Sequence, residues 1–437
     1  MAPPKAPDPI GPAAPECYWA DTATAPQLPP VSLDSSYDLI VIGAGFTGMN
    51  AALTAAEAGM QVLVLDAHAP GWGASGRNGG FCCIGGDHLG ITAIANRFGE
   101  DDAKRYALGQ LAAIDHVAAL CENHGIDADR CGQGEWVLAH KHERRADLLN
   151  YQRELAHFYG LQAQLRPTAN LDSAGNINPY SQPALWTPTG FGLHPLKYLY
   201  GLIDTALARG AHIHAPARVT GLRASPAGWR VQGEDFQLRA RRVLIATNAY
   251  TQDTLTRKLR GRLLPAQSNI LVTQPLPADT LRAMHWAHLT PAYDTRRLLY
   301  YFRLLPDGRL LFGGRAGISE SATSFAARRA QHTADFLQLF PAAHGLGIDY
   351  FWRGRVALSR SQTPHVAKLA NGLYCALAFH GNGIAMGSWS GHQAVKLMLK
   401  AEHQLPDFMQ RAPRRFPLPW LRPLYLAAAY VAYQWLD

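Results

Sequence analysis

Three glycines near the start of the chain have the spacing G-x-G-x-x-G, at Gly43, Gly45 and Gly48. Glycine at these places permits a tight turn, lets the backbone approach a pyrophosphate, and lets a helix pack closely on a strand. The N-terminus of the helix that follows would offer free N–H groups and the positive end of its dipole to the phosphates. The other residues of this turn are Ala44, Phe46 and Thr47. The turn is therefore predicted to bind a dinucleotide.

An acidic residue stands where such a site needs one. The apolar run 39–42 is typical of a strand buried on both faces, and the helical stretch after the glycines stops at Gly59. A second apolar strand, 62–65, ends on Asp66, whose carboxylate would bind a ribose 2′-OH. A glycine motif alone is weakly specific, but here strand, helix, second strand and acid follow in order.

Two further segments leave room for a ligand. The loop at 68–81 is dense in glycine, whose missing Cβ lets the backbone approach a flat or charged group. The buried strand at 242–249 runs into a turn of small residues, the form of another ligand contact. Candidate contacts in these segments are Gly73, Ala74, Ser75, Arg77, Asn78, Gly79 and Thr247. An ordinary flexible loop is the alternative for 68–81.

The elements that must position these residues form an α/β chain. The glycine motif stands near the start, a glycine turn followed by a helix at 384–400 stands near the end, and a mostly β insertion lies between them. The cofactor-binding domain is therefore predicted to be discontinuous. The predicted parts are a proline-rich arm at 1–36, a cofactor-binding domain at 37–130, 193–262 and 350–437, and a substrate domain at 131–192 and 263–349. Tyr18 and Trp19 are expected to dock the arm onto the body.

A hairpin at 297–314 is the predicted wall of the substrate site. The run 305–309, LPDGR, is a strong turn signal because Pro suits the first central position and Gly the left-handed one. Strand alternation puts Tyr301 and Arg303 on one face, and Tyr300 and Phe302 on the other.

The two tyrosines are expected opposite the glycines at 313–314, where missing side chains would leave room for a ligand. Aromatic faces at Tyr300 and Tyr301 could hold a substrate cation, each worth about 0.5 to 2 kcal/mol. Arg303 or Arg315 could bind a substrate carboxylate through two parallel hydrogen bonds. The alternative is that the tyrosines only pack the sheet.

Composition argues against several classes of protein. Apolar residues make up 48% of the chain, enough for a large core, and charged residues 17%, below the roughly 25% of an average chain. The net charge of +8 is scattered along the sequence, which argues against a nucleic-acid surface and fits anionic ligands. The 6 cysteines form no C-x-x-C pair, so neither disulfides nor a zinc site is indicated, and a cytoplasmic enzyme with reduced thiols is expected.

Metal binding and membrane anchoring are not predicted either. The His-x-His pairs at 140–142 and 212–214 have no evident third ligand. The N-terminus has no secretory signal pattern. The apolar segment 421–436 is too short to span a bilayer, so a packed C-terminal helix is expected, with attachment to a membrane surface as the alternative.

Together these motifs resemble the FAD-dependent amine-oxidising family that includes D-amino acid, glycine and sarcosine oxidases. The similarity is carried by YWADT before the first strand, IGAGFTGMNAAL, GWGASGRNGGF at 71–81 and FRLLPDGRLLFGGR at 302–315. AFHGNGIAMGSWSG at 378–391 and PLPWLRPLYLAAAY at 417–430 add to it. The resemblance therefore extends from about residue 16 to the end. Within the family, the chain looks most like gamma-glutamylputrescine oxidoreductases.

The resemblance implies a fold like that of D-amino acid oxidase and glutathione reductase. A discontinuous Rossmann-like FAD-binding domain would carry a mixed-sheet α+β substrate domain. By similarity, the three motif glycines would hold the FAD pyrophosphate, Asp66 the adenosine ribose, and Val219 the adenine through its backbone. The isoalloxazine would be lined on one side by Ser75, Arg77, Asn78 and Gly79, and on the opposite rim by His380, Gly381, Asn382, Gly383 and Ile384.

The sequence departs from the family pattern at Phe81, where relatives often have Gln, and at the segment 361–364, SQTP. Both departures bear on the substrate more than on the cofactor. Relatives with covalently bound flavin use a Cys or a His. Here Arg355 stands near one such position and the loop 73–80 has no His, so non-covalent FAD is expected.

The implied reaction is removal of hydride from a carbon that bears nitrogen, giving an imine that water hydrolyses. Oxygen or another acceptor would reoxidise the flavin, and the candidate catalytic residues are Tyr301, Arg303 and His380. One alternative is a flavin dehydrogenase of the same fold acting on an alcohol or hydroxy acid, with His194, His365 or His380 as the base. Others are an NAD-dependent dehydrogenase, since Asp66 suits NAD equally, and a non-catalytic flavin-binding surface protein.

Overall fold

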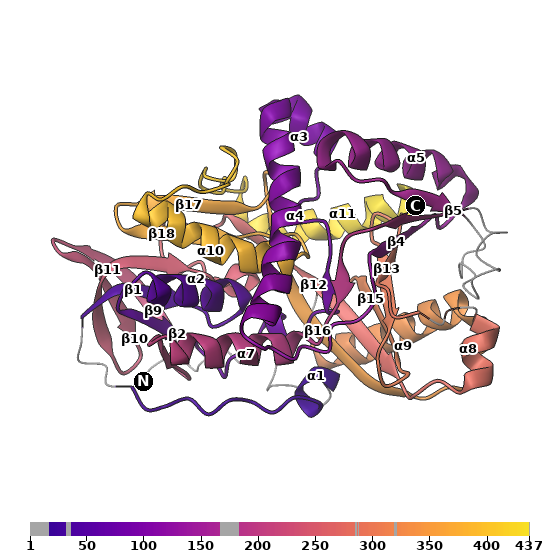
Figure 1. Cartoon of the computed structure of the whole chain (residues 1–437), viewed down its shortest axis with the longest axis horizontal. Helices are drawn as coiled ribbons and strands as arrows, with labels where there is room; N and C mark the ends of the chain where they lie inside the picture. The colour runs from indigo at the N-terminus through magenta and orange to yellow at the C-terminus, as the bar shows by residue number, and fades with distance from the viewer. Residues whose placement is uncertain are drawn as a thin grey trace.

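The computed structural model describes residues 17–31, 36–166, 183–284, 286, 288–318 and 321–436. Most of the predicted proline-rich arm lies outside these ranges. The described chain forms two halves, each built around an eight-stranded sheet (Figure 1). A small pairing of β3 (Phe81–Cys82) with β7 (Phe191–Gly192) stands apart from both sheets.

The first sheet interleaves strands from the start, middle and end of the chain. Its order is β17-β18-β11-β1-β2-β8, with β10 paired to β11 and β9 to β10. The five strands β18, β11, β1, β2 and β8 run parallel to one another, as expected for continuous apolar runs, whereas β17 and β10 pair antiparallel with β18 and β11. The bounds are β1 (Ser36–Ile42), β2 (Val62–Leu65), β8 (His212–His214), β9 (Val219–Ser225), β10 (Gly228–Gly233), β11 (Gln237–Ile245), β17 (His365–Ala370) and β18 (Leu373–Leu377).

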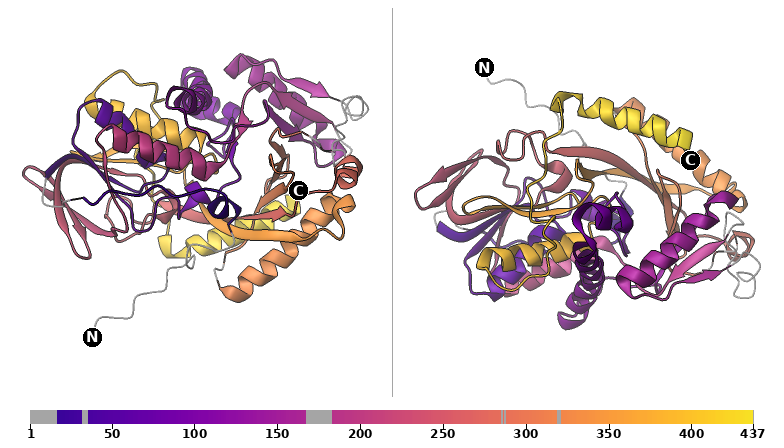
Figure 2. Two further views of the ribbon diagram at one scale, coloured as in Figure 1. Left: turned by 60° about the horizontal axis from the view of Figure 1, so that its bottom comes forward. Right: turned by 90° about the horizontal axis from the view of Figure 1, so that it is seen from above.

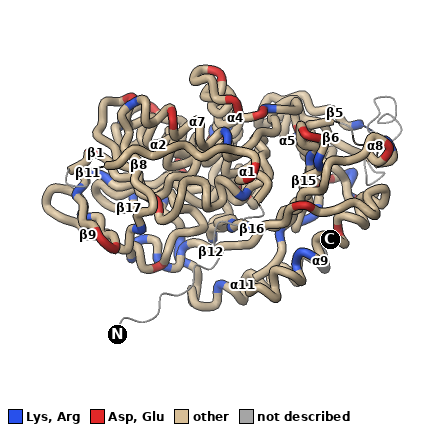
Figure 3. Tube along the Cα trace, turned by 90° about the horizontal axis from the view of Figure 1, so that it is seen from below, with Lys and Arg blue, Asp and Glu red and all other residues tan. Residues whose placement is uncertain are grey.

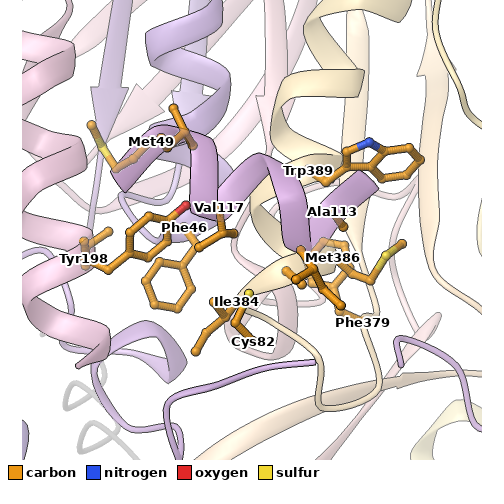
Figure 4. Close-up of a cluster of buried hydrophobic side chains, with 14 of the residues drawn as sticks. Phe46, Met49, Cys82, Ala113, Val117, Tyr198, Phe379, Ile384, Met386 and Trp389 are labelled. Carbon is orange, nitrogen blue, oxygen red and sulfur yellow. The ribbon is translucent and has the colours of Figure 1, made fainter. Parts of the chain in front are cut away.

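Helices cover one face of this sheet and a β-ribbon covers the other. Leu39 and Val41 belong to the core under α2 (Phe46–Glu57), α7 (Pro195–Ala208) and α10 (Ala385–Leu399). Ile40 and Ile42 point the opposite way and pack with Trp229 of β10. This alternation explains why the whole strand is apolar. The long α4 (Glu100–Asn123) completes the helical layer, and Figure 4 shows Phe46, Val117, Tyr198 and Met386 meeting there from four helices.

The second sheet has the order β16-β12-β15-β14-β13-β4-β6-β5. The bounds are β4 (Glu135–Leu138), β5 (Gln164–Arg166), β6 (Ala184–Thr187), β12 (Leu263–Thr273), β13 (Ala292–Asp294), β14 (Tyr300–Leu304), β15 (Leu310–Arg315) and β16 (Ile348–Ser359). α9 (Ala322–Leu339) and the short α8 (Ala278–Met284) lie on its outer face, where Phe302, Phe312 and Phe336 form a separate core. The inner face carries Ile270, Leu311 and Trp352, which join the main core of the first half.

Two predicted boundaries differ from the structure. β16 pairs with β12 along its whole length, so residues 350–359 belong to the second sheet and not to the cofactor half. The sequence of residues 350–359 does not reveal the strand with which they pair. Apolar residues at helical spacing over 91–124 predict one helix, but the structure has two, α3 (Ile91–Phe98) and α4, because Gly99 between them has a φ of +98°.

The remaining helices lie at the margins. They are α1 (Tyr18–Asp21), α5 (Arg145–Glu154), which continues into the π-helical turn η3 (Leu155–Tyr159), and the C-terminal α11 (Arg422–Leu436). α11 runs along the outside of the body (Figure 2) and packs its Leu426 on Leu264 and Ala266 of β12, which confirms the predicted packed helix. Within the described ranges, no helix combines the length and apolarity needed to cross a membrane.

The end of the N-terminal arm docks through its aromatic pair, as predicted. Trp19 is only 1% exposed and its indole N–H donates to the Asn78 carbonyl at 2.8 Å. The Tyr18 hydroxyl donates to the Asp307 carboxylate at 2.8 Å, at the tip of the β14–β15 hairpin. The ring of Trp19 also meets Trp352 edge-on, with 6.4 Å between centroids. α1 therefore ties the glycine-rich loop to the second sheet.

We expect Trp19→Ala to lower the free energy of unfolding by about 3–5 kcal/mol, because it removes a fully buried indole and leaves a carbonyl unpaired. Trp420→Ala is the matched control, since Trp420 is 73% exposed and should change stability by less than about 0.5 kcal/mol. Denaturant unfolding of the two variants checks this. Equal stability of both would mean that the arm is not structurally coupled to the body.

Candidate active site

A cavity of about 1410 Å³ lies along the carboxyl ends of β1, β2 and β11 in the first half. Ligands of open parallel sheets bind at this edge. Predicted contacts that line the cavity are Gly43, Gly45, Phe46, Thr47, Asp66, Gly73, Ala74, Ser75, Asn78, Val219, Thr247, Gly381 and Gly383. The predicted contacts that do not line it are Ala44, Gly48, Arg77, Gly79, Asn382 and Ile384.

The glycine turn at the start of α2 is closely packed. Gly43 has a φ of +108°, which favours glycine, and a side chain at Gly48 would overlap the Gly43 carbonyl oxygen. A Cβ at Gly45 would lie 2.7 Å from the Ser75 hydroxyl oxygen, which accepts the Phe46 N–H at 3.1 Å. Gly48 therefore packs the helix on the strand, while Gly45 keeps the wall of the cavity thin.

The N-terminus of α2 opens onto the cavity. Its N-cap, Gly45, has no side chain that could accept a hydrogen bond from the first-turn amides. The Asp66 carboxylate accepts the Ala44 N–H at 2.7 Å and the His68 N–H at 2.9 Å. Burial raises the pKa of Asp66, although these two hydrogen bonds oppose the shift. Asp66 thus holds the glycine turn in place while it lines the cavity.

Arg77 and Asn78 shape the glycine-rich loop from inside. The Arg77 Nε donates to the Trp72 carbonyl at 2.6 Å, so the guanidinium is used by the loop itself. The Asn78 amide donates to the carbonyls of Ala74 and Ser75 at 3.0 and 2.9 Å, and its oxygen accepts the Gly80 N–H. Both side chains therefore fix the loop conformation, and only Asn78 reaches the cavity wall.

The loop after β18 closes the opposite rim. His380 and Gly381 both have positive φ, +50° and +114°. The Asn382 amide donates to the Cys83 carbonyl at 2.6 Å, which ties this rim to the end of β3. The His380 Nε2 lies 3.2 Å from the Ser359 hydroxyl, and its buried Nδ1 has no partner. Burial, together with the charge of Arg315, lowers the pKa of His380 well below its ordinary value.

Residues 38–397 match the family described as DAO, FAD dependent oxidoreductase. The chain belongs to this family. It is 30% identical over 387 residues to the probable oxidoreductase OrdL of Haemophilus influenzae, with 87% of each chain covered. It is 28% identical over 388 residues to the gamma-glutamylputrescine oxidoreductase of Escherichia coli, with 89% of each covered.

A solved structure has the same fold. The glycine oxidase of Bacillus cereus superposes with a TM-score of 0.68 at 18% identity, covering 87% of this chain and 99% of that chain. The predicted fold class, a discontinuous FAD-binding half with a mixed-sheet half, is confirmed. The protein is therefore an FAD-dependent oxidoreductase, and NAD-dependent dehydrogenation is set aside.

The residues that line the cavity are chemically suited to bind FAD. Apart from the Phe46 N–H, which Ser75 accepts, the first turn of α2 can supply amide donors for a pyrophosphate, and the Asp66 oxygens keep lone pairs for a ribose hydroxyl. Basic residues lie over both halves, interspersed with acidic ones (Figure 3), so the net charge forms no single basic face on the side shown. No group of three or more metal-ligating side chains occurs within the described part of the chain.

An aromatic cluster in the cavity wall was not predicted from the sequence. His68 stacks on Trp72 with 3.9 Å between ring centroids, and Trp72 meets Tyr250 at 5.7 Å. The Arg218 guanidinium lies 3.3 Å from the His68 Nε2, and all four residues line the cavity. The sequence could have indicated these residues only through their positions. His68, Arg218 and Tyr250 each follow shortly after a strand, and Trp72 lies in the glycine-rich loop.

The hairpin has the predicted register but not the predicted space. Tyr300 pairs with Gly314 and Tyr301 with Gly313, as expected. A side chain at Gly313 would overlap the Tyr301 ring, so the missing side chains make room for the tyrosines themselves. The expectation that these glycines leave room for a ligand is wrong, because cross-strand packing fills the gap.

Arg303 is not placed to bind a substrate carboxylate. It is 1% exposed, and its guanidinium donates to the Gly79 carbonyl at 3.0 Å, the Leu193 carbonyl at 2.6 Å and the Cys131 thiol at 3.4 Å. Strand alternation gave its face correctly, but the glycine-rich loop covers that face here. Its contacts make it a residue that positions the loop.

We expect Gly45→Val to purify without FAD, because the branched side chain would meet Ser75 and fill the thin wall of the cavity. Gly221→Val is the matched control, since a Cβ there meets no atom within 4 Å. The ratio of flavin absorbance to protein absorbance measures occupancy in both. Full occupancy in Gly45→Val would show that the cofactor does not approach this turn.

Proposed function

We propose that this oxidoreductase oxidises a C–N bond of an amine or amino acid that carries a carboxylate, a substrate of the gamma-glutamylputrescine type. The product would be an imine, which water hydrolyses, and oxygen or another acceptor would take the electrons. FAD, when bound, supplies the acceptor for the hydride. We also propose that the residues lining the cavity hold FAD non-covalently, with the loops at 73–79 and 381–384 beside the flavin ring.

The observation that carries this proposal is the position of Arg315. It ends β15 on the inner face of the second sheet, and its guanidinium donates to the His380 carbonyl at the cavity rim. Burial lowers the pKa of Arg315, and Tyr430, Tyr301 and Tyr433 oppose this shift. In the described part of the chain no acidic side chain pairs with Arg315. A guanidinium with unused donors beside the rim is suited to bind a carboxylate in a two-bond fork.

Tyr301 is suited to form the wall of the substrate site beside the Arg315 guanidinium. Its hydroxyl lies 3.0 Å from the Ser268 hydroxyl, and its ring meets Phe81 edge-on at 5.3 Å. Burial raises the pKa of Tyr301 to about 12, so it stays protonated and does not act as a base at neutral pH. Loss of hydride from a neutral amine needs no such base, because the nitrogen lone pair drives it.

Alcohol oxidation, the alternative, would need a base for the hydroxyl proton. Both ring nitrogens of His194 are engaged, by the Lys197 N–H at 3.2 Å and the Thr22 hydroxyl at 3.0 Å. Those of His365 are engaged by the Ser361 hydroxyl and the Arg411 carbonyl, each at 2.7 Å. His380 keeps an unpartnered nitrogen, but burial and the charge of Arg315 lower its pKa well below the ordinary value, which makes it a weak base. This favours amine oxidation over alcohol oxidation.

Reduction of the flavin by hydroxy acids but not by amines would instead favour alcohol oxidation. Reduction by neither class of compound would favour a non-catalytic role.

We expect the anaerobic rate of flavin reduction by a simple alkylamine to rise about tenfold per pH unit from pH 6 to 9. A free alkylamine has a pKa of about 10.4, so only about one molecule in 10³ is neutral at pH 7. His380, with its lowered pKa, is neutral throughout this range, and Tyr301 remains protonated. Stopped-flow absorbance checks this, and a flat profile would contradict the requirement for a free neutral amine.

We expect Arg315→Met to raise KM for gamma-glutamylputrescine at least tenfold, about 1.4 kcal/mol, while KM for 1-aminobutane changes less than about threefold. The contrast isolates the carboxylate, because the second amine has none. Arg223→Met, on the exposed strand β9, is the control for loss of a positive charge. FAD content should be unchanged in both variants. Equal effects on the two amines would assign Arg315 a structural role.

A further inference from the structure

The C-terminal helix α11 has an apolar outer side. Its inner side packs Leu426 on Leu264 and Ala266 of β12. The positions exposed between residues 420 and 433 are all apolar, and they recur every three or four residues, which places them on one side of a helix. These positions, called the outer stripe below, are Trp420, Pro423, Leu424, Ala428, Val431 and Ala432. In Figures 2 and 3 α11 lies at the margin of the molecule.

The outer stripe is strongly exposed for its residue types. Trp420 is 73% exposed, Leu424 62% and Val431 57%, and Leu418, just before the stripe, is 56% exposed. Of the 7 exposed large hydrophobic side chains in the described part of the chain, these are 4. Apolar side chains exposed one at a time are ordinary, whereas a contiguous group marks a surface that binds a protein or a membrane.

Basic side chains gather beside the start of the outer stripe. Arg414 and Arg415 precede it in the chain and are exposed. Arg360 is also exposed, and its guanidinium donates to the Arg415 carbonyl at 3.3 Å. Arg260 is exposed too, and the next carbonyl group along the chain accepts the Phe416 N–H at 2.9 Å. Three separate segments therefore bring positive charge to this place.

Acidic residues are missing from this part of the sequence. Between Asp407 and Asp437 the chain contains four arginines and no Asp or Glu. Asp253 contacts this segment, but its carboxylate is paired with Arg422. The surface around the outer stripe is therefore apolar and positively charged at once.

α11 can lie on a bilayer but cannot cross one. Its 15 residues extend about 22 Å at 1.5 Å per residue, less than the hydrocarbon core of about 30 Å. Its inner side is also covered by β12. A helix with Trp and Leu on one side and basic residues beside them suits the plane of the membrane interface.

We propose that the outer stripe and the arginines beside it dock the protein on an anionic membrane surface. Trp420 and Leu424 enter the headgroup region, and Arg260, Arg414 and Arg415 face the anionic lipid headgroups. A second copy of the chain fits this surface less well. In a two-fold contact the same patch meets itself, so the arginines of the two copies would repel each other.

The test is sedimentation of the FAD-loaded protein with sucrose-loaded vesicles. Vesicles of phosphatidylcholine and phosphatidylserine at about 3:1 are compared with vesicles of phosphatidylcholine alone, at about 0.1 M salt. We expect the partition coefficient to be at least about tenfold higher for the anionic vesicles. Salt at about 0.5 M should remove this preference, because it screens the charges.

The apolar contribution is tested with Trp420→Ser combined with Leu424→Ser. We expect this pair to lower the partition coefficient at least about tenfold, because two side chains that enter the interface are removed. Leu108→Ser is the matched control, since Leu108 is 58% exposed on α4 and lies outside the stripe. It should change the partition coefficient less than about twofold.

The charge contribution is tested with Arg414→Gln combined with Arg415→Gln. This pair should lower binding to the anionic vesicles at least about tenfold and leave the weak binding to phosphatidylcholine unchanged. Arg223→Gln combined with Arg230→Gln is the control, because it removes two exposed arginines from β9 and β10. FAD content should be unchanged in every variant.

Equal binding to the two kinds of vesicle, or binding to neither, would overturn the proposal. Losses of the same size in the control variants would overturn it as well. If the serine pair converts a dimer into a monomer and wild type does not bind vesicles, the outer stripe joins copies of the chain instead. Should the serine pair lose FAD, the arginine pair and the comparison of lipids decide. No amine is present, so the result does not depend on the proposed function.

Discussion

The close approach of backbone to backbone at three glycines is the constraint on which the cofactor half depends. A side chain at Gly48 would overlap the Gly43 carbonyl, and one at Gly391 of α10 would overlap the Thr47 carbonyl of α2. The first contact sets α2 against the end of β1, and the second sets α10 against α2. Since α10 follows the rim loop at 380–383, the same packing that fixes the phosphate-binding turn also fixes the opposite rim. The cavity wall is therefore determined by backbone contacts more than by side chains.

A buried charge connects the two halves. Arg303 extends from β14 of the second sheet to carbonyls of Gly79 and Leu193, which flank the glycine-rich loop and the start of α7. Its carbonyl partners are neutral, so the charge is solvated by backbone dipoles and by the ring of Trp19, 5.5 Å away. Removal of this guanidinium would leave two buried carbonyls unpaired. The loop that borders the cofactor is thus held by the sheet that faces the substrate.

Features that depend on a local sequence pattern were predicted, whereas features that depend on contacts between distant segments were not. The spacing of Gly43, Gly45 and Gly48 predicts a strand, a turn and a helix because the turn is local, with Gly48 packed on the Gly43 carbonyl. The hairpin register followed from the turn residues 306–308. Alternation also assigned Arg303 and Tyr301 to the correct face. It did not indicate that the loop at 79–81 covers Arg303, or that β16 pairs with β12, because both depend on contacts between distant segments.

The inner face of the second sheet carries a basic and an acidic side chain that do not pair with each other. Arg315 lies on β15 and Glu135 on β4, with β14 and β13 between them. Strands in a sheet lie about 4.8 Å apart, so three steps place the two backbones about 14 Å from each other. The tyrosines of the intervening strands, Tyr293 and Tyr301, fill the inner face between them. Burial raises the pKa of Glu135 to about 8, so this carboxyl group is largely protonated at neutral pH and carries little charge. Arg315 stays charged and bears a desolvation cost in the free protein, so a ligand carboxylate that pairs with it would offset that cost.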